Sequence, residues 1–468
     1  MKPSGRKKLL MRFSINSFLV LFLLISSNFA EARGKEGNLE SILKGLAKGG
    51  THVTAQIVNL TNSRTLLSVN ADQPLNPASS IKLFTAYTAL ERLGINYQFK
   101  TGIYLNQDNS VCVKGGGDPS FVMEDLYLLV QGLKRKGLDQ YSGKITLDAT
   151  AYDEELYPED RSDQNSERAY NAPISGLNFN YNTISVFVNP TSKGSPAHVG
   201  LDFPFSFVKI EGKVMTASGT DVTWDKKGKG DLEIVSLGGK ISEDADEWRK
   251  PFRIRKPSLA FGEALSTMLE SGGVKSKTKP VVSEGTCLGD PYFVYSSKPL
   301  SFVVQLMDKY SNNFIADSLV KALDHEVNHR SGGAEGGLRF IRTEMLKVGV
   351  NLESKGRSMV SGSGLTNGNK VSASDFIGLL KHIHKEKRFL PEMFASLPIA
   401  GVDGTLKRKY EKSDVAERLR GKTGTLNGVQ SLVGVYPNDE GEWLGIAVIV
   451  NGGHGIPEAD LARFLSAH

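Results

Sequence analysis

A serine and a lysine lie three residues apart in the stretch LNPASSIKLFTAYTALERLG, residues 75–94. Apolar residues recur at helical spacing here, which predicts a buried helix with Ser79 and Lys82 on one face. A serine hydroxyl becomes a good nucleophile only when a nearby base takes its proton. A lysine can be that base if burial and a second positive charge lower its pKa. The pair therefore indicates nucleophilic catalysis, although a helix face with an exposed lysine would give the same pattern.

The second positive charge must come from elsewhere, and the sequence KTG occurs once, at Lys422, Thr423 and Gly424. It begins a β-rich run, so a strand edge there is expected to present Lys422 beside Ser79 and Lys82, with hydroxyls for a substrate carboxylate. Gly424 would let a ligand approach the backbone closely. A turn before a strand is the alternative explanation.

A third element is the stretch KYSNNFIADSL, in which Ser311 and Asn313 open a helical pattern. Serine and asparagine are also good helix caps, which is the alternative explanation for them. Each short motif is common on its own. Their order makes them specific: SxxK in an apolar helix, then SNN opening a helix, then KTGT on a strand.

In this order the motifs resemble those of the penicillin-recognising serine D,D-peptidases. Nearly the whole mature chain is similar to the low-molecular-mass class C penicillin-binding proteins, the penicillin-binding protein 4 type (peptidase family S13). Asn312 stands where many relatives have aspartate. The similar stretches are PASSIKLFTA, KGGGDPSF, LNFNYNTISVFVNP, YSNNFIAD, SGSGLT, GVDGTLKRK and GKTGTLNG.

The resemblance implies a role for each motif residue. Ser79 would be the acyl-enzyme nucleophile and Lys82 its general base, with the backbone N–H groups of Ser79 and Thr425 as the oxyanion hole. Ser311 would relay a proton to the leaving amine, and Asn313 would hold the substrate amide. The implied catalytic residues are Ser79, Lys82, Ser311, Asn313 and Lys422, which tunes the proton network, and the implied substrate-binding residues are Thr423, Gly424 and Thr425.

The resemblance also implies a reaction. It is that of a serine-type D-alanyl-D-alanine carboxypeptidase and endopeptidase that acts on peptidoglycan stem peptides and cross-links, and β-lactam antibiotics would acylate Ser79. No metal or organic cofactor is expected. A non-catalytic cell-wall-binding protein on the same fold is the alternative, and the presence of all the motif side chains argues against it.

Two other motifs point to different chemistry. HEVNH, residues 325–329, matches the HExxH of zinc metallopeptidases, but no third ligand has a recognisable spacing, and a solvated helix surface explains the pattern. ERAYN, residues 167–171, matches the ExxxN with which class A β-lactamases deacylate, but it precedes Ser311 instead of following it. Fast β-lactam hydrolysis is therefore not expected.

The first 32 residues are typical of a signal peptide, because a basic segment precedes the apolar run 18–25 and AEA at 30–32 offers a cleavage site. Removing them takes away five positive charges and one negative charge, and lowers the formal net charge from +6 to +2. No basic, aromatic-interleaved patch suggests nucleic acid. We expect a periplasmic protein with no stable membrane span after signal cleavage; an uncleaved anchor is the alternative. Cys112 and Cys287 could pair there, or remain two separate buried thiols.

The chain of 468 residues is long enough for two or three domains. Residues 52–70 and 429–453 each have the pattern of a β-hairpin, and helical periodicity recurs between them, in FIADSLVKALDHEVNHR, GLRFIRTEMLKVG and SASDFIGLLKHIHKE. We expect an α/β fold, a β-lactamase/transpeptidase-like sandwich in which an antiparallel sheet is flanked by helices. The expected catalytic domain comprises residues 33–97 and 296–468. Residues 98–295 would form a strand-rich insertion of one or two subdomains near the active-site rim.

Overall fold

The structure is a computed structural model that describes residues 39–158, 161, 166–230 and 232–468. The predicted signal peptide, residues 1–32, lies outside this described part. Among the described helices, none has both the length and the apolar character needed to cross a membrane.

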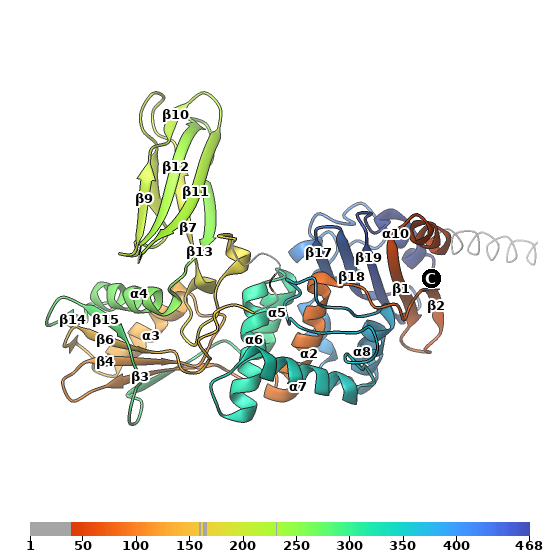
Figure 1. The fold of residues 1–468 in the computed structure, drawn as a ribbon, viewed down its shortest axis with the longest axis horizontal. Helices are drawn as coiled ribbons and strands as arrows, with labels where there is room; N and C mark the ends of the chain where they lie inside the picture. The colour runs from red at the N-terminus through yellow and green to blue at the C-terminus, as the bar shows by residue number, and fades with distance from the viewer. Residues whose placement is uncertain (1–38, 159–160, 162–165, 231) are drawn as a thin grey trace, which may run out of the picture.

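Five strands from the two ends of the chain form an antiparallel sheet in the order β17-β18-β19-β1-β2 (Figure 1). Strand β1 (His52–Asn59) pairs with β2 (Thr65–Val69) and with β19 (Trp443–Asn451). Strand β18 (Val429–Pro437) pairs with β19 and with the edge strand β17 (Arg420–Leu426). Both predicted hairpins are therefore confirmed.

Both faces of this sheet are buried, because successive side chains of a strand point to opposite faces and both sets are apolar here. On one face, Val433 and Ile449 pack in a core that includes residues of the helices α2, α6 and α8. On the other face, Leu432 and Val448 pack with residues of α10 and of the helical segment 39–48. The expected α/β sandwich is confirmed.

The helices come mainly from the second half of the chain, and the three predicted between the hairpins are confirmed as α6, α7 and α8. Helix α2 carries Lys82 at its first position, and α5 leads through a short turn into α6. The bounds are α2 (Lys82–Leu93), α5 (Leu300–Lys309), α6 (Asn313–Asn328), α7 (Ala334–Lys347), α8 (Ala373–Glu386), α9 (Leu390–Ser396) and α10 (Glu458–Ser466).

A second five-stranded sheet lies in the middle of the chain, in the order β15-β6-β4-β3-β16, and α3 (Met123–Arg135) and α4 (Pro257–Ser271) pack against it. Cys112 on β4 forms a disulfide with Cys287, so the cysteines pair, which the sequence had left open. The strands are β3 (Lys100–Leu105), β4 (Val111–Gly115), β6 (Lys144–Asp148), β15 (Val281–Glu284) and β16 (Phe293–Ser296), and the short strands β5 (Gln140–Tyr141) and β14 (Lys275–Ser276) form a parallel pair.

Residues 183–253 project from this region as an arm built from two smaller sheets (Figure 1). One sheet contains β7 (Thr183–Asn189), β8 (His198–Leu201) and β13 (Trp248–Arg253). The other contains β9 (Val208–Gly212), β10 (Met215–Ala217), β11 (Asp221–Lys229) and β12 (Leu232–Ser242). In contrast, Ala151, Tyr152, Ala172 and Ile174 pack in the core that contains α2 and α6. The segment that precedes the arm is therefore anchored to the helices that carry the motif residues.

Candidate active site

Ser79 lies in a short 3-10 turn, η1 (Ala78–Ile81), that leads directly into α2. Asn76 fixes this turn, because its Oδ1 accepts the N–H of Ala78 at 2.9 Å and its Nδ2 donates to the carbonyl of Thr366 at 3.0 Å. Ala78 has a φ of +46°, a left-handed conformation that costs free energy in a residue other than glycine. The predicted helix thus begins as a tight turn, which leaves Ser79 partly exposed while Lys82 is fully buried.

The amino group of Lys82 points at Ser79. Its Nζ lies 2.9 Å from Ser79 Oγ and 2.8 Å from Asn313 Oδ1, and it also donates to the carbonyl of Ser363. Burial lowers the pKa of Lys82 well below its ordinary value, and the positive charge of Lys422 lowers it further. After losing one proton, the amine still donates to two of these acceptors and directs its lone pair at the third. The geometry therefore suits a neutral lysine that accepts a proton from Ser79.

Ser311 and Asn313 reach the same site because α6 begins there. The left-handed φ of Ser311, +54°, turns the chain sharply between α5 and α6. Asn312, the residue that differs from many relatives, caps the helix, since its Oδ1 accepts the N–H of Ile315 at 3.1 Å. Asn313 receives a hydrogen bond from Lys82, and its Nδ2 donates to the carbonyl of Tyr170 at 3.4 Å.

Lys422 and Thr423 come from the edge strand β17, which packs against η1. Lys422 Nζ donates to Ser311 Oγ at 2.8 Å and to the carbonyl of Thr423 at 2.7 Å. Burial lowers the pKa of Lys422 to about 8, although the nearby carboxyl of Asp308 acts in the opposite direction. Thr423 Oγ1 lies 2.7 Å from Thr405 Oγ1, and Thr425 is exposed.

Gly424 allows β17 to approach the turn that carries Ser79. A Cβ at this position would lie 3.0 Å from the backbone nitrogen of Ser79, and would collide with the carbonyl of Pro77 and the hydroxyl of Ser431. The groups that approach Gly424 closely in the structure therefore belong to the protein itself and not to a ligand. The role of Gly424 toward a ligand stays a prediction.

The structure thus brings the three motifs into one hydrogen-bonded constellation. Three hydrogen bonds between motif side chains hold it together: Lys82 to Ser79, Lys82 to Asn313, and Lys422 to Ser311. Both lysines are completely buried, whereas the side chains around them are partly exposed. Such a site can present a hydroxyl to a substrate while two buried amines exchange protons beneath it.

Two groups in the constellation were missed in the sequence. The stretches SGSGLT and GVDGTLKRK contain Ser363 and Thr405, but similarity alone gave neither residue a role. Lys82 contacts the backbone carbonyl of Ser363, and no side-chain pattern reports a backbone carbonyl. Thr405 lies inside the short turn Gly404–Leu406, and no pattern in the sequence marks its contact with Thr423.

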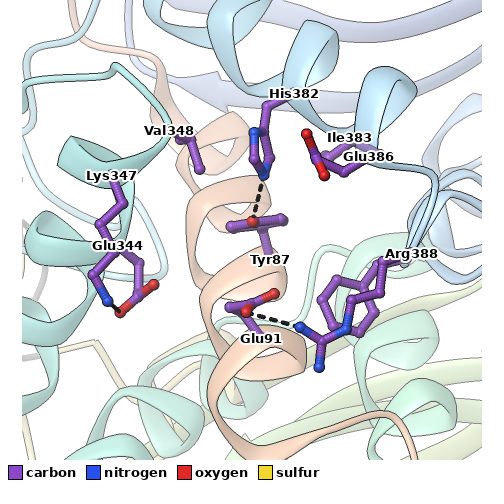
Figure 2. Close-up of a pocket in the computed structure, with 10 residues that line it drawn as sticks. Tyr87, Glu91, Glu344, Lys347, Val348, His382, Ile383, Glu386 and Arg388 are labelled. Atoms are coloured by element: carbon purple, nitrogen blue, oxygen red, sulfur yellow. Dashed lines mark hydrogen bonds and ion pairs between the residues drawn. The ribbon is translucent and has the colours of Figure 1, made fainter.

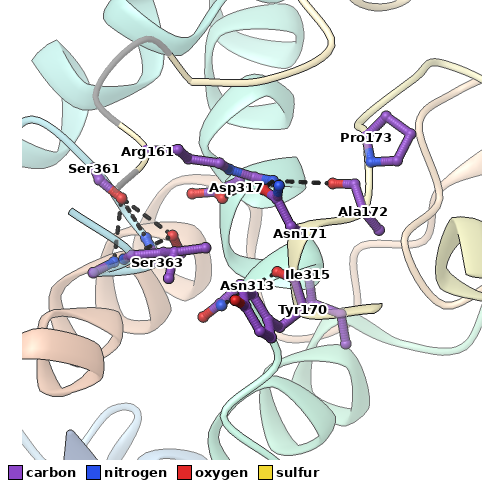
Figure 3. A network of polar contacts seen from close by, with 12 residues as sticks. Arg161, Tyr170, Asn171, Ala172, Pro173, Asn313, Ile315, Asp317, Ser361 and Ser363 are labelled. Atoms are coloured by element: carbon purple, nitrogen blue, oxygen red, sulfur yellow. Dashed lines mark hydrogen bonds and ion pairs between the residues drawn. The ribbon is translucent and has the colours of Figure 1, made fainter. Parts of the chain in front are cut away.

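A segment from the middle of the chain also reaches the site, as Figure 3 shows. Arg161 Nη2 forms an ion pair with Asp317 Oδ2 at 2.7 Å, one helical turn after Asn313, and both side chains are buried. Arg161 Nη1 also donates to Asn171 Oδ1 at 2.8 Å. The 3-10 turn η2 (Ala169–Asn171) packs against α6 through these contacts and through the carbonyl of Tyr170.

Glu167, the glutamate of the ERAYN motif, forms ion pairs with basic side chains. Burial alone would raise the pKa of Glu167, but its hydrogen bonds from Lys226, Arg253 and Arg255 outweigh that effect and lower the pKa to about 2. Glu167 of ERAYN therefore ties the segment before the arm to the arm itself.

The HEVNH residues make contacts at the end of α6. His325 Nδ1 lies 2.5 Å from the carbonyl of Arg330, and Glu326 accepts a hydrogen bond from Tyr97 at 2.7 Å. His329 ends the helix in a left-handed conformation with a φ of 52°. Throughout the described ranges, no group of three His, Cys, Asp or Glu side chains is placed to hold a metal ion.

A cavity of about 260 Å³ lies farther along α2, and Figure 2 shows the side chains around it. The hydroxyl of Tyr87 is 2.8 Å from His382 Nε2, and Arg388 pairs with Glu91 at 3.0 Å. None of the motif residues lines this cavity, so it is distinct from the constellation around Ser79.

Comparisons with known proteins agree with the arrangement. Residues 35–463 match the profile of the D-Ala-D-Ala carboxypeptidase 3 (S13) family. The chain is 28% identical over 446 residues to the D-alanyl-D-alanine carboxypeptidase of Actinomadura sp. (strain R39), covering 90% of this chain and 81% of that protein. It is 24% identical over 457 residues to the D-alanyl-D-alanine carboxypeptidase DacB of Haemophilus influenzae, covering 94% and 93%.

The fold is also that of solved structures. Two crystal structures of penicillin binding protein 4 (dacB) from Haemophilus influenzae, one of them complexed with a novel β-lactam, have TM-scores of 0.74 and 0.70 to this chain. Each is 22% identical in sequence to this chain, and the match covers 91% of this chain and 97% of the crystal structure's chain.

Proposed function

The chain belongs to the D-Ala-D-Ala carboxypeptidase 3 (S13) family, and we propose that it works as a serine-type enzyme through an acyl-enzyme at Ser79. Its substrates are the D-Ala-D-Ala ends of peptidoglycan stem peptides, and also the D-Ala-linked cross-links, so that it is both a carboxypeptidase and an endopeptidase. β-Lactams acylate the same serine. The observation that carries the proposal is the 2.9 Å contact between buried Lys82 and partly exposed Ser79.

Acylation begins when neutral Lys82 accepts the proton of Ser79 while Ser79 Oγ attacks the carbonyl carbon of the penultimate D-Ala. The bond between that carbon and the nitrogen of the leaving residue then breaks. The leaving amine takes a proton through Ser311, whose Oγ receives a hydrogen bond from Lys422. Water then hydrolyses the ester at Ser79 and releases the shortened peptide.

The remaining motif residues hold the substrate. Thr423 and Thr425 bind the terminal carboxylate beside the positive charge of Lys422, and Gly424 lets the substrate lie close to β17. Asn313 Oδ1 accepts from Lys82 and one N–H of its Nδ2 donates to the carbonyl of Tyr170, so the other N–H donates to a substrate carbonyl. The N–H groups of Ser79 and Thr425 stabilise the tetrahedral oxygen, as is usual for acyl transfer.

We assign residues 33–97 and 296–468 to the catalytic domain and residues 98–295 to the insertion. Support comes from the two hairpins, which are 359 residues apart at their nearer ends yet pair in one sheet through β1 and β19, where Asn59 lies opposite Leu444. The protein acts in the periplasm after cleavage of residues 1–32, where peptidoglycan is accessible. No membrane anchor, nucleic acid or metal is part of this proposal.

Intact-protein mass spectrometry after incubation with penicillin tests the proposal. The mature chain should gain the mass of one penicillin, and Ser79→Ala should gain none. Ser276→Ala is a matched control, because Ser276 and Lys279 repeat the SxxK spacing outside the site, and it should react like the wild type. EDTA should change nothing.

A folded wild-type protein without an adduct would refute the serine mechanism and favour the cell-wall-binding alternative. Peptidase activity that EDTA abolishes would favour HEVNH instead. Chromatography of a pentapeptide and of a cross-linked muropeptide dimer, each incubated with the enzyme, would separate the carboxypeptidase activity from the endopeptidase activity.

A further inference from the structure

Asp308 is a completely buried carboxyl behind the active site that the mechanism above does not use. It lies in the last turn of α5, three residues before Ser311, and its backbone carbonyl accepts the N–H of Ser311 at 3.4 Å. Its Oδ2 accepts a hydrogen bond from Ser396 Oγ on α9 at 2.9 Å, whereas its Oδ1 has no hydrogen-bond partner among the described residues. Burying a carboxylate with a single partner is costly unless opposite charge lies nearby.

The nearby opposite charge is that of the two motif lysines. Burial raises the pKa of Asp308 to about 7, and the positive charges of Lys422 and Lys82 oppose that rise. In turn, the negative charge of Asp308 raises the pKa of Lys422. Asp308, Lys82 and Lys422 therefore form one electrostatic unit beneath Ser79 and Ser311.

Two other carboxylates near α5, one on α6 and one next to η4, have partners of their own. On α6, Asp317 pairs with Arg161 at 2.7 Å. Next to η4 (Gly404–Leu406), Asp403 pairs with Lys309 at 2.6 Å. Helix α2 contributes Lys82 itself, and α9 contributes the hydroxyl of Ser396. Glu392 on α9 has a buried Oε2 with no hydrogen-bond partner among the described residues, whereas the charges that act on the pKa of Asp308 are those of the two lysines.

We propose that Asp308 is a positioning residue for the lysine pair: its buried carboxylate is the counter-charge that keeps Lys422 protonated while Lys82 is neutral. Two neighbouring buried lysines are not both stable as cations, and one carboxylate compensates only one of them. Lys422 donates to Ser311 and attracts the substrate carboxylate, so it needs its charge. Lys82 must give up its charge to accept the proton of Ser79. The inference rests on the proposed function, because that function gives the two lysines these different protonation states.

Asp308→Asn removes the charge while preserving the shape of the side chain and its contact with Ser396. Without the carboxylate, both lysines should lose their protons at lower pH. In the profile of acylation rate against pH, the acidic limb reports the protonation of Lys82 and the basic limb reports that of Lys422. Both limbs should therefore move to lower pH by about one unit. A purely structural role would lower the rate at every pH without moving either limb.

The rate of acylation by a fluorescent penicillin, measured as a function of pH, tests this shift. Asp403→Asn is the matched control, because it removes a carboxylate from the same neighbourhood that is paired with Lys309, and its limbs should stay in place. Ser396→Ala removes the hydrogen bond that lowers the pKa of Asp308, so it should shift the limbs in the same direction by less. A folded Asp308→Asn protein with unshifted limbs overturns the inference. If that variant does not fold, unshifted limbs in Ser396→Ala overturn it.

A readout without activity separates this inference from the proposed function. NMR titration of isotopically labelled lysine, with Lys422→Met to assign the signal, reports the protonation of Lys422 directly. The Lys422 titration should move to lower pH in Asp308→Asn, and an unmoved titration overturns the inference even in an inactive chain. A moved titration in a protein that penicillin never acylates would refute only the proposed function.

Discussion

Adding one methyl group at Gly424 is expected to separate the two halves of the active site. In Gly424→Ala the new Cβ would lie 3.0 Å from the nitrogen of Ser79, which is 0.4 Å short of the 3.4 Å at which ordinary contact begins. It would come still closer to the carbonyl of Pro77, a backbone atom that no rotation can move away. Strand β17 must therefore retreat from η1 by a distance on the order of 1 Å.

The retreat would carry Lys422 and Thr423 away from Ser79, because these residues belong to β17 and Ser79 does not. A misplacement of about 1 Å in a catalytic group costs about 100-fold in rate. Overpacking of this kind lowers the free energy of unfolding by about 1–3 kcal/mol, which a protein of ordinary stability survives. We expect a folded variant whose rate of acylation by penicillin falls about 100-fold.

Gly421→Ala, on the same strand, is the control. Its Cβ would lie 2.7 Å from Leu432 Cδ1, the end of a side chain that can rotate, so it should lose stability but keep its acylation rate. Denaturant unfolding and fluorescent-penicillin labelling measure the two quantities separately. Wild-type acylation in Gly424→Ala, or equal losses of acylation in both variants, would show that the packing of β17 on η1 does not set the rate.

Three further predictions follow from buried groups. Lys82→Ala should fold and lose acylation by about 10²–10⁴-fold, the usual contribution of a general base; retained labelling would remove Lys82 from that role. Burial lowers the pKa of Lys422 from 10.5 to about 8, so between these pH values the unfolded chain binds a proton that the folded chain lacks, and the wild-type protein gains stability as pH rises. Lys422→Met lacks this titrating group, so its stability should not rise between pH 8 and pH 10.5 as that of the wild type does; urea unfolding that gives the same rise in both proteins would contradict this. Replacing Cys112 and Cys287 together by alanine opens a loop with a sequence separation of 175 residues. It should cost about 2–5 kcal/mol in urea unfolding while leaving penicillin labelling intact, and loss of labelling in a folded variant would contradict the separation of that sheet from Ser79.

The elements that position the site could be predicted because their patterns are local. The hairpins alternate or run continuously apolar between turn residues, and α6 and α8 repeat every three to four residues. That the motif residues lie together could be predicted because each motif is short and contiguous. No single motif is specific, and the order of Ser79, Ser311 and Lys422 along the chain then made the prediction specific.

What the sequence could not reveal depends on contacts between distant residues or on the backbone. The left-handed conformation of Ala78, which turns the expected helix into η1, is stabilised by Asn76 and is unusual for alanine. The carbonyl of Ser363 meets Lys82 across 281 residues, and Arg161 meets Asp317 across 156. The pairing of two cysteines so far apart likewise depends on where the sheet places them.

Arg161 shows why a distant part of the chain matters for Lys82, the proposed base. Asp317 raises the pKa of Lys82, whereas Arg161 lowers it, so their ion pair at 2.7 Å compensates a negative charge that would otherwise favour the protonated lysine (Figure 3). Breaking a buried ion pair by removing one partner leaves an uncompensated charge and typically costs about 3–5 kcal/mol. Loss of Arg161 would therefore raise the pKa of Lys82 in two ways, because its own positive charge disappears and Asp317 loses its partner. Arg161 and Asp317 thus contribute to the electrostatics of the proposed site, and among the described residues Asp308 is the charged group that raises the pKa of Lys422.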